Sequence, residues 1–222
     1  MEFQILPVLS TEEVKRFLAE FSRAKFADGK STASGAALAV KHNLQAERSG
    51  GEWSGLDGIL FAALRDNHEF QLFAHPRRIL APSYSRYEPG MRYGTHIDSA
   101  IMGGANPLRT DLAMTLFLSA PDSYEGGELV IESASGEQEI KLAAGEAVVY
   151  PATTLHRVAP VTSGVRQVAV TWIQSAVRDP SLRSILYDLG KAERNAEEAK
   201  DGAATLLLSK CYHNLLRYAV DA

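Results

Sequence analysis

The chain has a single cysteine, Cys211, among its 222 residues. One thiol cannot form an internal disulfide, and four-thiolate zinc or iron–sulfur sites need more cysteines than this chain contains. Cross-links are also unnecessary, because a chain of this length can bury a self-sufficient hydrophobic core. The cysteine content therefore indicates a protein of a reducing compartment. Cys211 falls on an apolar helical stripe, so we expect it to be a small buried hydrophobic residue.

Long apolar runs and an excess of positive charge are absent as well. Pro7, Glu12 and Glu13 lie where a signal peptide would need an unbroken apolar stretch, and no later run is long enough to cross a membrane. The formal net charge is −4 and the basic residues are scattered, which leaves no electrostatic footprint for nucleic acid. We therefore expect a cytoplasmic protein with neither a membrane nor a nucleic acid as its partner.

Helical spacing is found near the N-terminus. Ser10 followed by Glu13 is a capping-box pattern, and the apolar residues after it repeat at helical spacing. A second helix is predicted around Ile59–Leu64, before Asn67. Residues 28–55, which are rich in Gly, Ser and Ala, have weaker periodicity. We expect a loop there, with a strand near Ala37–Val40.

From Ile79 onward, short apolar stretches alternate with turn residues, which is the pattern of an all-β core. Several stretches alternate apolar with polar residues as half-buried strands do. The predicted strands are Leu112–Leu118, Glu128–Glu132, Glu139–Leu142, Ala147–Tyr150, His156–Val161 and Gln167–Ile173. Such spacing predicts a sandwich or a double-sheet jelly roll.

The C-terminal residues return to helical spacing. Asp179 is a predicted N-cap with Pro180 at the first helical position, and Asp201-Gly202 separates this helix from a second one. The expected apolar stripe of the second helix is Leu207, Cys211, Leu215 and Tyr218. The fold class is thus α+β: a double-stranded β-helix (jelly roll) core with flanking N-terminal helices and a C-terminal helical hairpin. We expect one domain over residues 1–177, with its core at about 79–177, and a small helical domain over residues 178–222. The hairpin could pack on the core or form a homodimer contact.

A candidate metal site combines residues from two distant segments. His96 and Asp98 are two positions apart, so on an extended chain they point to the same face. His156 lies on a later strand that a jelly roll could bring alongside. Two imidazoles and one carboxylate on one face leave positions open for further ligands, which suits non-haem iron(II) oxygenases. A His-x-Asp pair alone is a weak signal, but the distal histidine and the β context strengthen it.

Arg166 is the candidate anion-binding residue. It follows the turn Thr162–Gly164, ten positions after His156, so it can extend into the same cavity from the next strand. Its planar guanidinium matches a carboxylate with two parallel hydrogen bonds, as the far carboxylate of 2-oxoglutarate would require. The alternative is a surface arginine whose stem covers apolar neighbours. Four other histidines have no ligand spacing, and we expect them to be ordinary: His42, His68, His75 and His213.

Four spaced motifs resemble one protein family. They are Tyr87-x-x-Gly90-x-x-Tyr93-x-x-His96-x-Asp98, Glu125-Gly-Gly-Glu-Leu129, Gly145-Glu-Ala-Val-Val-Tyr150 and His156-x-Val-x-Pro-Val-x-x-Gly-x-Arg166. Together they resemble the prolyl-4-hydroxylase-like branch of the Fe(II)- and 2-oxoglutarate-dependent oxygenases, and within it the bacterial PKHD-type hydroxylases. The resemblance covers essentially the whole chain.

This resemblance implies a dioxygenase that hydroxylates an unactivated C–H bond with O2 and 2-oxoglutarate, releasing succinate and CO2. It places Tyr87 and Tyr93 in the co-substrate pocket or directly around it, with Trp172 beside it, and it implies ascorbate (vitamin C) as a reductant. The substrate is expected to be a peptidyl, prolyl-like group or a small molecule connected with iron uptake. Two alternatives remain: a non-catalytic jelly-roll module that binds a metal or another ligand, and a sensor of 2-oxoglutarate or iron.

Overall fold

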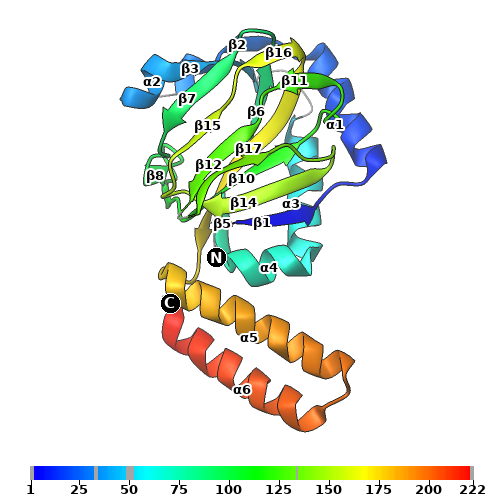
Figure 1. The fold of residues 1–222 in the computed structure, drawn as a ribbon, viewed down its shortest axis with the longest axis vertical. Helices are drawn as coiled ribbons and strands as arrows, with labels where there is room; N and C mark the ends of the chain where they lie inside the picture. The colour runs from blue at the N-terminus through cyan, green and yellow to red at the C-terminus, as the bar shows by residue number, and fades with distance from the viewer. Residues whose placement is uncertain (1–2, 33–34, 49–52, 134, 221–222) are drawn as a thin grey trace.

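Two antiparallel sheets face each other in the protein, whose computed structural model describes residues 3–32, 35–48, 53–133 and 135–220 (Figure 1). The larger sheet has the strand order β1-β14-β10-β17-β6-β4-β2, with β5 added beside β17. Its strands are β1 (Gln4–Pro7), β14 (Glu146–Pro151), β10 (Leu112–Phe117), β17 (Arg166–Ser175), β6 (Ser83–Tyr87), β4 (Leu44–Ala46), β2 (Phe26–Asp28) and β5 (Pro76–Ile79).

The smaller sheet has the order β13-β12-β15-β7-β3 and lies across the larger one (Figure 1). Its strands are β13 (Gly136–Ile140), β12 (Leu129–Ser133), β15 (His156–Val158), β7 (Arg92–His96) and β3 (Lys41–His42). Two short pairs complete the described strands: β11 (Tyr124–Gly126) with β16 (Val161–Gly164), and β8 (Ile101–Met102) with β9 (Leu108–Arg109). The expected jelly-roll core is confirmed. The predicted strand His156–Val161 is divided in two, as Pro160 supplies no backbone donor.

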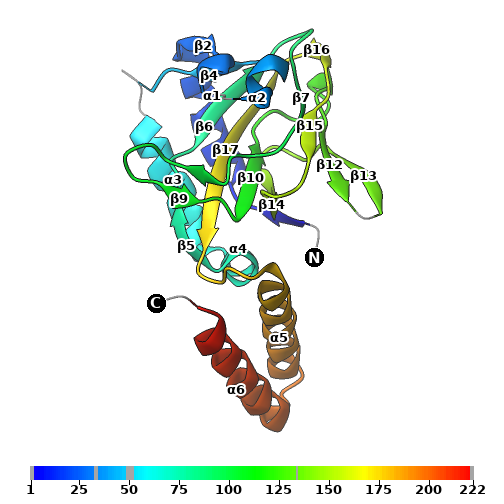
Figure 2. The ribbon, with the colours of Figure 1, turned by 90° about the vertical axis from the view of Figure 1, so that its left-hand side faces the viewer.

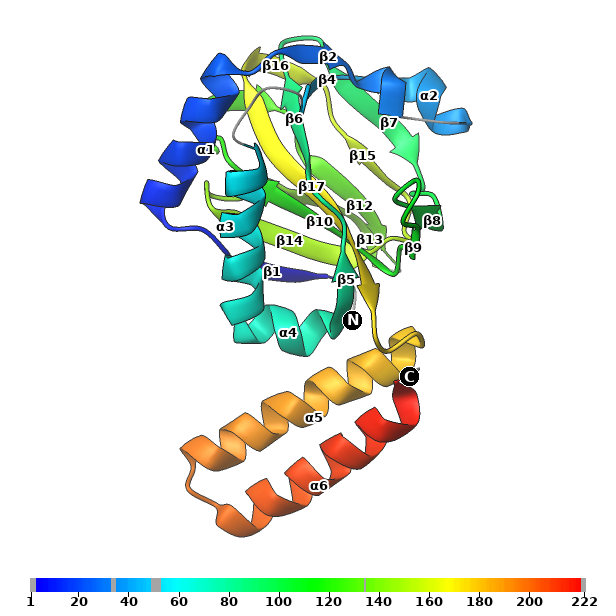
Figure 3. The same ribbon diagram turned by 180° about the vertical axis from the view of Figure 1, so that it is seen from behind.

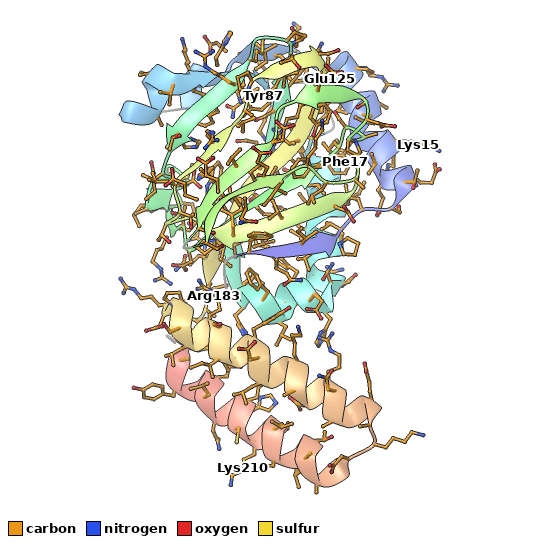
Figure 4. The ribbon with its side chains drawn as sticks, viewed as in Figure 1. Lys15, Phe17, Tyr87, Glu125, Arg183 and Lys210 are labelled. Carbon is orange, nitrogen blue, oxygen red and sulfur yellow. The ribbon has the colours of Figure 1, made fainter. Side chains whose placement is uncertain are left out.

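Helices cover the outer face of the larger sheet, as the view from behind shows (Figure 3). They are α1 (Thr11–Arg23), α3 (Trp53–Asp66) and α4 (His68–Ala74). The expected capping box is present: Ser10 accepts from the Glu13 amide, and Glu13 accepts from the Ser10 amide. Phe17 points from α1 into a core shared by these helices and the sheet (Figure 4). A second apolar cluster fills the space between the two sheets, next to the site described below.

The structure corrects the prediction for residues 28–55. Ala36–Val40 is the helix α2, where a strand was expected, and the 3-10 helix η1 (Gly29–Thr32) precedes it. The sequence Ala-Ala-Leu-Ala-Val favours a helix because alanine and leucine have high helix propensity. Short strands β3 and β4 follow, and α3 already begins at Trp53, where the loop was expected to continue. The parts of the prediction that fall on residues 33–34 and 49–52 lie outside the described residues.

The C-terminal hairpin consists of α5 (Pro180–Glu198) and α6 (Gly202–Ala219), which extend below the sheets (Figure 2). Asp179 caps α5 through the amides of Ser181 and Leu182, as its N-cap pattern predicted. The buried residues of α5 are Arg183, Leu186 and Tyr187, all near its start, where Figure 4 shows Arg183 at the junction with the core.

The predicted apolar stripe of α6 is partly wrong. Cys211 is exposed, and Leu207 and Tyr218 are 60% and 80% exposed. The half-buried residues Leu208 and Tyr212 lie one position further along the helix, and Tyr212 packs against the core cluster. Shifting a helical stripe by one residue rotates it by about 100°, which explains why Cys211 faces solvent. Among the described residues, none of the helices is both long and apolar enough to cross a membrane.

Candidate active site

Three predicted metal ligands converge where β7 and β15 lie side by side. His96 ends β7 and His156 begins β15, and the two residues are direct partners in the strand pairing. Asp98 follows two residues after His96, past the end of the strand rather than on it. One ligand atom from each residue lies within 4.8 Å of the others, and Asp98 Oδ1 is 3.9 Å from His156 Nε2.

Both imidazoles are held by backbone carbonyls. His96 Nδ1 is 2.8 Å from the Gly94 carbonyl oxygen, and His156 Nδ1 is 3.0 Å from that of Thr154. Because a carbonyl can only accept, each Nδ1 must donate, and in a neutral imidazole this leaves Nε2 with a free lone pair. This arrangement fixes the ring orientation and presents Nε2 as a ligand, as outer hydrogen bonds do around bound metals.

Two tyrosines hold the histidine rings in place. Tyr93 stacks on His96 with ring centroids 3.6 Å apart, and Tyr150 contacts His156 edge-on at 5.2 Å. Burial, with His156 as a second cause, lowers the pKa of His96 to about 4, so its imidazole is neutral at physiological pH. Burial raises the pKa of Asp98, and its Oδ2 has no hydrogen-bond partner among the described residues.

These observations fit a divalent cation. Two imidazoles and a carboxylate are the donor set of a facial triad, and a cation would satisfy the buried Asp98 oxygen and remove the cost of its charge. The triad leaves coordination positions open toward a cavity of about 450 Å³ that all three residues line. The cluster therefore suits a metal that must also bind exchangeable ligands.

Arg166 lines the same cavity and is 1% exposed. Its guanidinium lies over the rings of Tyr87 and Phe117, at 5.0 and 5.3 Å from their centroids. Neither Nε nor Nη2 has a hydrogen-bond partner within the described part of the chain. A buried cation with unused donors is costly unless an anion pairs with it, so this corner suits a carboxylate. The surface alternative for Arg166 is wrong.

The tyrosines and the tryptophan singled out in the sequence also line the cavity. Tyr87 is partner to Arg166 across β6 and β17, while Tyr93 stacks on His96 and Trp172 interacts with Asp98. Sequence reasoning did not single out Tyr150 or Lys41, which line the cavity too. Tyr150 ends the motif that begins at Gly145, and that position was a usable signal. Lys41 lies in the weakly patterned segment before the core, where no motif marks it.

Comparison with known proteins agrees with this geometry. The profile of the 2OG-Fe(II) oxygenase superfamily matches residues 82–174, which contain all of the residues named so far in the site except Lys41. A PKHD-type hydroxylase of Rippkaea orientalis is 46% identical over 219 residues, covering 98% of each chain. One from Klebsiella pneumoniae is 44% identical over 97% of each chain. The chain belongs to the PKHD-type hydroxylases of the 2OG-Fe(II) oxygenase superfamily.

Solved structures show the same fold at lower identity. A Pseudomonas putida prolyl-4-hydroxylase has a TM-score of 0.54 at 18% identity, covering 78% of this chain and 92% of its own. The viral collagen prolyl hydroxylase of Paramecium Bursaria Chlorella virus-1 has a TM-score of 0.55 at 20% identity, covering 79% and 97%. This PKHD-type hydroxylase is therefore an enzyme, a 2-oxoglutarate-dependent dioxygenase that uses Fe(II), and the family resemblance seen in the sequence is confirmed.

Proposed function

We propose that this PKHD-type hydroxylase inserts a hydroxyl group into an unactivated C–H bond, with His96, Asp98 and His156 holding Fe(II) and Arg166 holding 2-oxoglutarate. The observation that carries the proposal is the shared cavity: a triad of two imidazoles and a carboxylate opens into the same 450 Å³ space as a buried guanidinium whose Nε and Nη2 lack partners among the described residues. Bound Fe(II) with 2-oxoglutarate supplies the activation of O2, while the protein supplies placement and water exclusion.

Each residue has a defined part in this proposal. The Nε2 atoms of His96 and His156 and one Asp98 oxygen would hold the metal, which would also have to bind the co-substrate and oxygen. Arg166 would bind the far carboxylate of 2-oxoglutarate through its guanidinium donors, and a planar guanidinium can pair with a carboxylate through two parallel hydrogen bonds. The rings of Tyr87 and Phe117 keep the guanidinium in place and exclude water from it.

The substrate is proposed to be a peptidyl, prolyl-like group or a small molecule connected with iron uptake. Two structural neighbours are prolyl hydroxylases, which supports the first class only by analogy of fold. We also propose that the protein is cytoplasmic, forms a homodimer and uses ascorbate as a reductant. The division into a domain of residues 1–177 and a domain of residues 178–222 is part of the same proposal.

Anaerobic titration with Fe(II) tests the metal and co-substrate assignments. In the presence of 2-oxoglutarate we expect a weak visible charge-transfer band from the chelated co-substrate, and we expect His96→Ala and Asp98→Ala to lose it. His213→Ala, which removes an exposed histidine of α6, is the matched control and should keep the band. A folded, metal-loaded protein without the band would contradict the proposal. If the band forms, oxygen-dependent release of succinate then serves to screen substrates.

A further inference from the structure

A second buried cation faces the cavity on a different wall. Lys41 lies on β3, next to Tyr93 of β7, and only 6% of its surface is exposed. Its Nζ donates to Thr32 Oγ1 at 2.8 Å and lies 5.3 Å from the centroid of the Tyr93 ring. Among the described residues it forms no ion pair with a carboxylate, and Asp28 and Asp98 act on it only from a greater distance.

This ammonium has unused hydrogen-bonding capacity. A protonated lysine carries three N–H donors, and Thr32 accepts one of them. Burial lowers the pKa of Lys41 to about 8, so the side chain is still mostly protonated at neutral pH. Leaving the other N–H donors of this buried ammonium without an acceptor is costly, and an anionic oxygen in the cavity would remove that cost.

The two cations have different neighbours, so we expect each to bind a different anionic group. Arg166 is packed by Tyr87 and Phe117, whereas Lys41 is packed by Thr32 and Tyr93. Lys41 also acts electrostatically on His96 and Asp98, which places it beside the metal end of the cavity. One 2-oxoglutarate molecule is accounted for by the metal and Arg166. A second anionic group can therefore be received at Lys41.

We propose that Lys41 binds an anionic oxygen group, such as a carboxylate, of the molecule that is hydroxylated. The inference rests on the proposed function, and it adds a chemical class to the unidentified substrate. Ile97 and Leu155 line the same cavity beside the metal ligands and are 54% and 43% exposed. They provide an apolar rim for the carbon skeleton. The substrate thus has an apolar part near the metal and an acidic group that reaches Lys41.

Binding of matched acids and amides to the Fe(II)- and 2-oxoglutarate-loaded protein, without oxygen, tests this proposal. One pair is 4-fluorobenzoate and 4-fluorobenzamide, and the other is trifluoroacetyl-Gly-Asp-Gly-amide and its asparagine counterpart. Fluorine NMR line widths give the affinity of each probe, with 2-oxoglutarate at saturation so that Arg166 is occupied. We expect one acid to bind about tenfold or more tightly than its amide. The pair that shows the preference distinguishes a free organic acid from an acidic peptide side chain.

Variants connect this preference to Lys41. Lys41→Met should abolish the preference, Lys41→Arg should keep most of it, and Lys30→Met should leave it unchanged. Lys30 is a matched control because it is an exposed lysine of η1, close in sequence to Thr32 but outside the cavity. The charge-transfer band of each variant shows that its metal site is folded and loaded.

Three results would overturn the inference. Equal affinity for acid and amide in both pairs excludes an anion site at Lys41. A preference that survives in Lys41→Met places the site elsewhere. A tenfold loss of 2-oxoglutarate affinity in Lys41→Met assigns the lysine to the co-substrate. A missing charge-transfer band in the unaltered protein instead contradicts the proposed function itself, so the two failures are distinguishable.

Discussion

At the scale of single residues, the site contains buried charged groups that need a ligand to pair with them. Arg166 is almost fully enclosed, yet the described residues leave two of its nitrogens unpaired, and Asp98 has an unpaired oxygen. A protein tolerates such groups when a ligand completes them, because an unpaired buried charge costs several kcal/mol. The unliganded enzyme is therefore less stable than the same fold with its metal and co-substrate.

Replacement of Arg166 tests this balance. Arg166→Met should weaken 2-oxoglutarate binding by about 30-fold or more, roughly 2–4 kcal/mol, because a charge-assisted pair is lost. Without 2-oxoglutarate the variant should unfold at the same temperature as the parent or higher, since the uncompensated charge is gone. Thermal unfolding with and without 2-oxoglutarate, and titration of the charge-transfer band, measure both effects.

Arg157→Met is the control for that experiment, because Arg157 pairs with Glu137 on the surface, away from the cavity. It should leave the 2-oxoglutarate affinity unchanged. If Arg166→Met kept its affinity and lost several degrees of stability, Arg166 would be a structural residue.

Gly127 supports Arg166 from behind. Its φ is +69°, and a Cβ there would lie 3.0 Å from Arg166 Cδ and 2.9 Å from Val161 Cγ2. Gly127→Ala should destabilise the fold by about 1–3 kcal/mol and weaken 2-oxoglutarate binding, through backbone strain and displacement of the arginine. Gly136→Ala is the control: its φ is +112° but nothing lies within 4 Å of the added carbon. Urea unfolding and co-substrate titration of both variants measure the difference, and equal co-substrate affinity in the two would refute the supporting role.

At the scale of elements, the sequence predicted helices and strands best where the apolar pattern extended over many residues, and worst where a segment was short. The strands that begin at or next to His156 and Arg166 were predicted from turn residues and alternation, whereas no strand bounds were predicted for β7 around His96. The capping box marked the start of α1 correctly. The convergence of His96, Asp98 and His156 also followed, although Asp98 lies past the end of β7.

The weakly patterned segment 28–55 shows why the rest could not be predicted. Ala36–Val40 is five residues long, too short for a helical period to differ from a strand, so the helix propensity of its alanine and leucine residues was the remaining local signal. Lys41 directly follows this helix. Its position in the cavity depends on the pairing of β3 with β7, which joins residues about 50 positions apart and leaves no local signature.

His75, the left-handed residue that ends α4, gives the junction with the hairpin a pH dependence. Burial, and then the charge of Arg183, lowers the pKa of His75 to about 4. Because this folded-state value lies below the unfolded value of about 6.5, only the unfolded chain takes up a proton as the pH falls through that window. Stability is therefore retained above about pH 6.5 and is lost as the pH falls toward 4.

His75→Asn removes this titration and suits the left-handed backbone. Between pH 7 and pH 5 the parent protein should lose about 1–2 kcal/mol more than the variant, after allowance for partial solvent contact. Urea unfolding of both proteins at the two pH values measures the difference. Identical losses would mean that His75 titrates alike in the folded and unfolded states.

At the scale of the whole molecule, the hairpin is attached through the first part of α5. Tyr187 belongs to the core cluster shared with the larger sheet, Leu186 is fully buried, and further along α5 Arg194 pairs with Glu69 of α4. Within the described part of α6 no residue is buried, and Figure 4 shows Lys210 on its outer side. The exposed apolar residues of α6 could contact a second copy of the chain, and the expected homodimer stays a prediction. The domain boundary at residue 178 stays a prediction as well.

A matched pair of leucines tests whether the hairpin unfolds with the core. Leu186→Ala, at a position with 0% exposure, should lower the free energy of unfolding by about 2–5 kcal/mol in a single transition. Leu206→Ala, at a position that is 74% exposed, should change it by less than about 0.5 kcal/mol. Circular dichroism and tryptophan fluorescence followed during urea unfolding distinguish one transition from two. Two transitions would make residues 178–222 an independent domain.

Strand β17 runs from Arg166, at the proposed co-substrate site, to the base of the hairpin. Its even-numbered residues face the cavity, and its odd-numbered residues face the helices. Arg166, Val170 and Trp172 line the cavity, whereas Ala169 and Ile173 pack in the cluster shared with the helices. Side chains of a strand alternate between its two faces. Substitutions at the even-numbered positions would therefore change substrate or co-substrate binding, whereas substitutions at the odd-numbered positions would change the stability of the fold. An engineer seeking a new substrate range can thus vary one face of this strand and leave the scaffold on the other face intact.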